Sequence, residues 1–182
     1  MAVVADFIVA GTGSRSLRVA DRPVQVAAME VVTERVARLV LEHDERLVVM
    51  SGGAEGFDEL LARVALKLGV RLWLALPSKT YLDYYWRRNS LLGYDRGDEA
   101  RQILDAAEKV TYVAEGILGT KQLKVDGLHV NFHRNFWMVD TADDWLALGP
   151  VKPGSGTAQC VEAIRAAGRW RDEMLVSLPS RT

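Results

Sequence analysis

Apolar runs of strand length alternate along this chain with segments in which apolar residues recur every three to four positions. The first three runs are DFIVA, RLVVM and VRLWLALP. The spacing predicts a helix from about Pro23 to His43, after the first run, and a second helix, after RLVVM, that ends at Gly69. Such alternation is typical of crossover helices that connect parallel strands. We therefore expect a doubly wound α/β fold, with a mainly parallel sheet and helices on both faces.

The two predicted helices each present one apolar face. Asp21 is placed to cap the first helix, and Pro23 suits its first turn. These apolar faces are expected to pack against the sheet. They comprise Ala28, Val32, Val36, Leu39 and Val40 on the first helix and Leu61, Val64, Ala65 and Leu68 on the second.

The second half of the chain is less regular. We expect helices at residues 80–94 and 98–108 and a strand at 109–114, followed by a long glycine-containing loop from Glu115 to Val130. A helix at 132–141, a fifth strand at 144–149 and a helix at 158–168 then complete one domain over residues 1–170. The tail, residues 171–182, could add a short edge strand.

Composition narrows the class of protein. The 182 residues carry a net charge of −1, so no general attraction to nucleic acid is expected, although a local basic patch stays possible. A single cysteine, Cys160, argues for a reducing compartment. The first apolar run lacks the basic flank of a signal peptide, and no run approaches the length of about 20 residues that spans a bilayer. We expect a cytoplasmic protein that does not bind membranes.

Three strand ends are followed by glycine-rich turns. The turns are AGTGSRS at Ala10–Ser16, MSGGAEGFD at Met50–Asp58 and PGSGTAQ at Pro153–Gln159. In a parallel sheet all three turns lie at the carboxyl edge, where open α/β sheets bind ligands. Backbone N–H groups at glycines and at helix N-termini favour anions. The three turns together therefore predict a phosphate-binding edge.

Two familiar phosphate-binding motifs do not fit these turns. A Walker A loop ends in Gly-Lys-Ser/Thr, and neither of the first two turns contains the lysine. A dinucleotide fingerprint requires a third glycine where this chain has Ser16, and an acid at the end of the second strand where it has Ser51.

The joint pattern of motifs over residues 3–170 resembles the SLOG superfamily, the Rossmann-like group that includes DprA, the LOG phosphoribohydrolases and the YpsA-like proteins. SGGAEGFD resembles its Gly-Gly-x-x-Gly-x-Asp segment, and GTGSR resembles the turn after its first strand. RNFWMVDTADDW and GSGTAQCV resemble two blocks of the YpsA-like branch. The resemblance implies a Rossmann-like sheet with a nucleotide site along its carboxyl edge.

The resemblance also implies which residues would form that site. Asp58 would accept a hydrogen bond from a ribose hydroxyl or cap its helix, and the third turn would form a second phosphate cradle opposite Arg134 and Asn135. The complete expected set is Gly11, Thr12, Gly13, Ser14, Arg15, Ser51, Gly52, Gly53, Gly56, Asp58, Arg134, Asn135, Gly154, Ser155, Gly156 and Thr157.

One departure from the family pattern bears on catalysis. LOG hydrolases carry a glutamate three residues after the threonine of the third turn, and this chain has Cys160 there. Glu162 lies two residues further along, roughly 200° round a helix from the direction of Cys160, and is expected to point away from the site. The glutamate of the LOG mechanism is therefore missing, and no catalytic residue is assigned.

Three functional hypotheses follow. The first is a protein that binds a nucleotide or an ADP-ribose-like molecule without turnover and without a cofactor. The second is a nucleotide N-glycosidase that uses another acid, with Asp58 or Asp140 as candidates. The third, DprA-like binding of single-stranded DNA, is disfavoured by the net charge and the absence of a long basic stripe. A homodimer is possible if the aromatic residues near Trp86 are exposed.

Several side chains allow a structural or a functional interpretation. His129 and His133 have the spacing of metal ligands, but no third ligand accompanies them, so no metal is expected. Cys160 is more simply a buried small residue than a nucleophile. Asp143 and Asp144 suit caps and turns as well as acid–base chemistry. The aromatic and basic segment Tyr81–Asn89 could stack on a base or pack into the core or a dimer contact.

Overall fold

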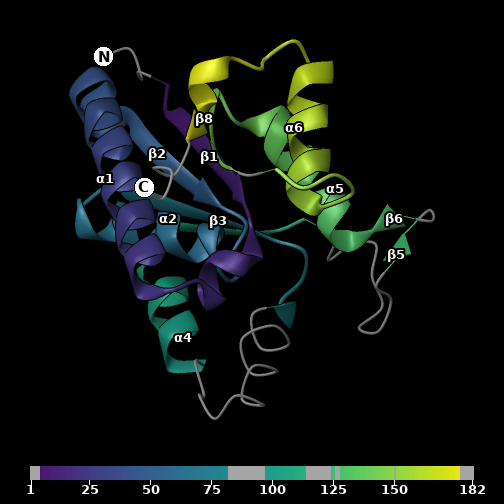
Figure 1. The fold of residues 1–182 in the computed structure, drawn as a ribbon, viewed down its shortest axis with the longest axis horizontal. Helices are drawn as coiled ribbons and strands as arrows, with labels where there is room; N and C mark the ends of the chain where they lie inside the picture. Colours follow the sequence, from purple (N-terminus) through teal and green to yellow (C-terminus); the bar gives the residue numbers. More distant parts are fainter. Residues whose placement is uncertain (1–4, 82–96, 114–123, 126–127, 150, 177–182) are drawn as a thin grey trace.

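The computed structural model describes residues 5–81, 97–113, 124–125, 128–149 and 151–176. Within them, six parallel strands form one sheet in the order β4-β3-β2-β1-β7-β8 (Figure 1). The strands are β1 Phe7–Gly13, β2 Leu47–Ser51, β3 Arg71–Leu76, β4 Lys109–Tyr112, β7 Asp144–Leu148 and β8 Leu175–Val176. The expected parallel sheet is confirmed.

Helices cover both faces of the sheet, as a doubly wound fold requires. Figure 1 shows α1, α2 and α4 on one side and α5 and α6 on the other. Short 3₁₀ segments follow β1, α1 and the last helix. The helix bounds are α1 Arg22–His43, α2 Phe57–Lys67, α4 Gly97–Ala106, α5 Val130–Thr141 and α6 Gly156–Ala166, and the 3₁₀ segments are η1 Arg15–Val19, η2 Asp44–Arg46 and η4 Asp172–Met174.

Each face of the sheet has its own apolar core, because successive side chains of a strand point to opposite faces. On β1, Val9 packs with the cluster under α1 and α2, whereas Ala10 packs with the cluster under α5 and α6. Leu146 and Trp145 divide between the two clusters in the same way on β7. Both faces of the central strands are therefore apolar, which is the origin of the uninterrupted apolar runs in the sequence.

The chain changes direction across the sheet at β1. Strands β2, β3 and β4 follow one another on one side of β1, and β7 then pairs with its other side. Open α/β sheets bind ligands in the crevice outside such a switch point, at the carboxyl ends of the strands. The turns that follow β1 and β7 flank this crevice directly, whereas the turn after β2 lies one strand away.

Most predicted elements are present with small shifts of their ends. Asp21 occupies the N-cap position of α1, but its side chain makes no capping hydrogen bond. Val40 is only partly buried on that helix, and Leu68 is the C-cap of α2. Of the helix expected at 80–94, only residues 80 and 81 are among the described residues.

Two expectations for the second half need comment. The long loop was predicted wrongly in part, because β5 Lys124–Val125 pairs antiparallel with β6 Leu128–His129 and α5 begins at Val130. Two-residue strands are too short to produce a periodic pattern. The edge strand expected in the tail is β8, parallel to β7. None of the described helices has the length and apolar character needed to cross a membrane.

Candidate functional site

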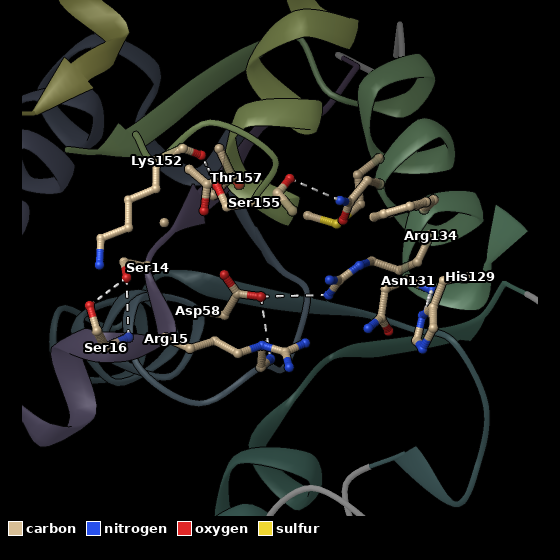
Figure 2. A pocket seen from close by; sticks show the side chains of 18 residues that line it. Ser14, Arg15, Ser16, Asp58, His129, Asn131, Arg134, Lys152, Ser155 and Thr157 are labelled. Atoms are coloured by element: carbon tan, nitrogen blue, oxygen red, sulfur yellow. Dashed lines mark hydrogen bonds and ion pairs between the residues drawn. The ribbon is translucent and has the colours of Figure 1, made fainter. Parts of the chain in front are cut away.

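A cavity of about 500 Å³ opens at the switch point between β1 and β7 (Figure 2). Its walls come from the end of β1 and the turn after it, from the N-terminus of α6, from the first half of α5 and from Asp58 on α2. The volume lies within the range of small-molecule sites. The crevice expected from strand order is therefore a real hollow in this protein.

The turn after β1 brings two serines and an arginine to the cavity. The Ser14 hydroxyl caps η1 by accepting the Ser16 backbone N–H at 3.1 Å, and it lies 2.6 Å from the Ser16 hydroxyl. Arg15 donates from Nη2 to the phenol oxygen of the buried Tyr81 at 3.4 Å. All three turn residues line the cavity, so this turn can offer hydroxyl groups and a guanidinium to one ligand.

The turn after β7 places the N-terminus of α6 at the cavity. Ser155 is the N-cap: its hydroxyl accepts the Ala158 N–H at 3.1 Å and donates to the carbonyl of Lys152 at 2.6 Å. Gly156 and Thr157 follow as the first helical residues, whose N–H groups have no partner within a helix. Because the N-terminus of a helix carries partial positive charge, this wall suits an anion, and Lys152 adds a full charge beside it.

A buried ion pair forms the floor between α2 and α5. Asp58 and Arg134 lie 3.5 Å apart, with side chains 9% and 7% exposed, and Arg134 also donates to the Gly52 carbonyl. Asp58 accepts the Ala54 N–H at 3.3 Å. Burial raises the pKa of Asp58, although Arg134, the Ala54 hydrogen bond and Arg15 oppose the shift. The site therefore holds a carboxyl group that keeps its proton to higher pH than usual.

The turn after β2 supports the site from behind. Ser51 donates from its hydroxyl to the Asp58 backbone carbonyl at 2.8 Å and accepts the Gly53 N–H at 3.2 Å. A Cβ at Gly52 would overlap Arg134 Nη1, and a Cβ at Gly56, whose φ is 88°, would lie 2.7 Å from the Ser14 carbonyl oxygen. These glycines permit close packing against α5 and the first turn, which explains their presence without any phosphate.

The structure brings most of the expected site residues together. The expected residues that line the cavity are Gly11, Thr12, Gly13, Ser14, Arg15, Asp58, Arg134, Asn135, Ser155, Gly156 and Thr157. The expected residues that do not line it are Ser51, Gly52, Gly53, Gly56 and Gly154. Contact of either set with a ligand stays a prediction.

Sequence reasoning missed several residues of the wall, which are Ser16, Ala54, His129, Asn131, Phe132, Met138 and Lys152. Lys152 directly precedes the third turn, where an anion was expected, so the sequence could have identified it as a site residue. Asn131 lay outside every expected element, since the loop was expected to end at Val130 and the helix to begin at Phe132.

The alternative metal and nucleophile interpretations find no support in the described residues. His129 caps α5, its Nδ1 accepting the Asn131 N–H at 3.2 Å. No group of three His, Cys, Asp or Glu side chains within the described ranges could hold a metal ion. Cys160 is 1% exposed, and burial raises the pKa of its thiol to about 12. The thiol is therefore neutral near pH 7.

The remaining acids are structural or remote from the cavity. Asp143 accepts the Ile8 N–H at 2.8 Å, and Asp144 pairs with Arg171 at 2.6 Å. Asp140 and Glu162 are exposed and do not line the cavity. Of the two acids considered for catalysis, Asp58 alone lies in the cavity wall.

The raised pKa of Asp58 predicts a specific pH dependence of stability. Between the ordinary aspartate pKa of 3.8 and the higher pKa of Asp58 in the folded protein, the folded protein holds a proton that the unfolded chain has lost. The free energy of unfolding should therefore fall as pH rises through this window, by up to about 1.4 kcal/mol per pH unit. Asp58→Asn should lack this contribution. Urea unfolding at several pH values measures the free energy of unfolding of the wild type and of Asp58→Asn. If it depends on pH in the same way in both proteins, the pKa of Asp58 is not raised.

Comparison with solved structures identifies proteins of similar fold. No protein-family model matches the sequence, and no curated protein matches it. DNA processing protein A (DprA) from Streptococcus pneumoniae superposes with a TM-score of 0.59 and 19% identity, covering 97% of this chain. The chain is similar in fold to the part of DprA that it matches. It spans about half of that protein, since the match covers 51% of the DprA chain.

Two further structures agree with the DprA fold. DprA from Helicobacter pylori gives a TM-score of 0.57 at 19% identity, over 97% of this chain and 67% of its own. The structural genomics target TM1055 gives 0.52 at 18% identity, over 90% and 71%. The fold expected from the resemblance to the SLOG superfamily is thus confirmed. The YpsA-like branch is not confirmed.

Proposed function

We propose that the protein binds a nucleotide or a nucleotide-derived molecule such as ADP-ribose in the cavity at the switch point, without chemical turnover. One observation carries the proposal: the cavity joins a helix N-terminus to Arg15, Arg134 and Lys152, with Asp58 as the sole carboxylate among the described residues that line it. A cavity of this charge and volume suits a phosphorylated small molecule.

Binding without turnover is supported by the chemistry of the wall. The position of the LOG glutamate is occupied by Cys160, a buried neutral thiol, and Glu162 is exposed. Asp58 is committed to Arg134 and to the backbone of Ala54. No free carboxylate is therefore positioned in the described part of the cavity to activate water.

A nucleotide N-glycosidase is the second candidate, because Asp58 is a cavity carboxyl whose pKa is raised by burial. Such a group could protonate a departing base. Incubating the protein at high concentration with nucleoside monophosphates or NAD, and measuring free base by chromatography, tests this. Release that Asp58→Asn abolishes would favour the enzyme over the binding protein.

Single-stranded DNA is the third candidate, and the comparison supplies its reason, since the DprA from H. pylori is described by its single-stranded DNA binding mode. Fluorescence anisotropy with labelled oligothymidylate at two salt concentrations tests it. Binding to DNA should weaken steeply with salt, and mononucleotides at millimolar concentration should compete only if the cavity is the DNA site.

A ligand screen tests the main proposal. Thermal shift with AMP, ADP-ribose, NAD and ribose 5-phosphate should raise the midpoint for at least one nucleotide, in proportion to the logarithm of its concentration over Kd. Isothermal titration calorimetry then gives the affinity and stoichiometry. If no nucleotide shifts the midpoint or gives heat, the proposed function is wrong. Homodimer formation and a cytoplasmic location stay predictions of the sequence.

Arg15→Ala should weaken any phosphate-bearing ligand that the screen identifies. A charge-assisted hydrogen bond contributes about 1.5–3 kcal/mol, which corresponds to a Kd raised roughly 10- to 150-fold. Arg38→Ala is the matched control, because Arg38 is 61% exposed on α1 and pairs only with Glu34 within the described residues. Calorimetry measures the affinity of both variants for the ligand. If Arg15→Ala binds as tightly as Arg38→Ala, Arg15 does not contact the ligand.

A further inference from the structure

Two polar atoms in the α5 wall of the cavity lack hydrogen-bond partners among the described residues. They are Nε of Arg134 and Oδ1 of Asn131, and both atoms are buried. Arg134 as a whole is 5% exposed. A buried polar atom without a partner destabilises the folded protein, and more so when the group is charged, so native structures contain few of them.

The position of the two atoms distinguishes them from other unpartnered groups. Gln159 Oε1 is also buried and has no partner among the residues that the structure describes, but Gln159 does not line the cavity. Asn131 and Arg134 both line it, and their spacing of three residues places them on the same face of α5. A ligand that enters between these two side chains could therefore pair with both atoms.

The cavity has two chemically different ends. Figure 2 shows Ser14, Ser16 and Lys152 on one side of the view, with Asn131 and His129 on the other. The first end, with the α6 N-terminus, suits phosphate. The second end carries the atoms of Asn131 and Arg134 that lack partners among the described residues, and the same helix adds the apolar side chains of Phe132 and Met138 to the cavity lining. An apolar wall with one donor and one acceptor suits a flat heterocycle better than a sugar phosphate.

We propose that the α5 end of the cavity is a nucleobase subsite, in which Arg134 donates to a ring nitrogen and Asn131 accepts from an exocyclic amino group. This inference rests on the proposed function and specifies its ligand class: a nucleoside phosphate with an amino-substituted base, such as adenine or cytosine. Both protein atoms are covered by neighbouring groups in this structure, so the Asn131 side chain rotates on binding to admit the base, while the Arg134 guanidinium keeps its contacts with Asp58 and the Gly52 carbonyl.

The subsite predicts discrimination against bases that lack the amino group. A site built to hydrogen-bond a substrate N–H leaves a buried acceptor unpaired when the analogue lacks it. We expect AMP to bind about tenfold more tightly than purine riboside 5′-monophosphate, which differs only in the 6-amino group. CMP should show the same preference over its analogue without the 4-amino group.

Asn131→Leu tests the subsite, because leucine keeps the branched shape of asparagine and removes both polar atoms of its side-chain amide. The variant should bind AMP about tenfold more weakly than the wild type and should bind AMP and purine riboside 5′-monophosphate equally. Gln159→Leu is the matched control: it removes another buried amide outside the cavity and should retain the full preference. Calorimetry gives the affinity of each of the two variants for AMP and for purine riboside 5′-monophosphate. The thermal midpoint of each variant shows whether it is folded.

The outcomes separate the subsite from the proposed function. If the wild type binds no nucleotide, the proposed function is wrong, and the nucleobase subsite is then wrong as well. If nucleotides bind but the amino group makes no difference, or UMP and IMP bind most tightly, the cavity holds nucleotides and the subsite is wrong. A preference that persists unchanged in Asn131→Leu also overturns the role of Asn131.

Discussion

Gly52→Ala should strongly weaken ligand binding and lower the free energy of unfolding by about 3–5 kcal/mol. A Cβ at this position would overlap Arg134 Nη1 and lie 2.6 Å from Asp58 Oδ2. The guanidinium would have to leave the Gly52 carbonyl and Asp58, which separates a buried ion pair. Displacing Arg134 also changes the cavity floor, so we expect at least roughly 100-fold weaker binding. Urea unfolding and calorimetry measure the two effects.

Gly149→Ala is the control for this prediction. The same added methyl group would meet Leu175 Cδ1 at 3.6 Å, which is ordinary van der Waals contact, and Gly149 does not line the cavity. It should change stability and affinity little. A Gly52→Ala variant as stable and as tight-binding as Gly149→Ala would show that Arg134 relocates without cost, and the packing role assigned to Gly52 would be wrong.

Arg134→Ala should be comparably severe for a different reason. Removing one partner of a buried ion pair leaves the other uncompensated and costs about 3–5 kcal/mol. Asp58 would lose the guanidinium that opposes its raised pKa, so the pKa should rise further and the loss of stability should grow with pH. Urea unfolding at pH 5 and pH 8 measures this trend.

A double-mutant cycle separates the ion pair from the packing of the two side chains. Asp58→Ala combined with Arg134→Ala should cost clearly less than the sum of the single variants, because no unpaired buried charge remains. Additive losses of stability would mean that the two groups do not interact, and the 3.5 Å pair would then contribute nothing measurable.

The local parts of the site could be predicted from the sequence. The glycine turns after β1 and β7 were placed at the carboxyl edge because each follows an apolar run and precedes a helical segment. The exposed position of Glu162 followed from helix periodicity alone, since Cys160 faces the core. These inferences needed only residues that are close together in the chain.

The parts that depend on distant contacts could not be predicted. The order of the strands shows that the turns after β1 and β7 are neighbours and that the turn after β2 lies to the side. The role of Gly52 depends on Arg134, 82 residues away. Asn131 was missed because the start of α5 was placed at Phe132, two residues late, which left Asn131 outside the expected helix.

The burial of Cys160 has a practical consequence. Its thiol is 1% exposed and has a pKa of about 12, whereas modification by maleimide requires an accessible thiolate. A cysteine introduced on the surface would therefore react with maleimide in preference to Cys160, and Cys160 would not have to be replaced first. Leu41, which is 86% exposed on α1 and does not line the cavity, offers a place for a fluorophore that reports on ligand binding in solution.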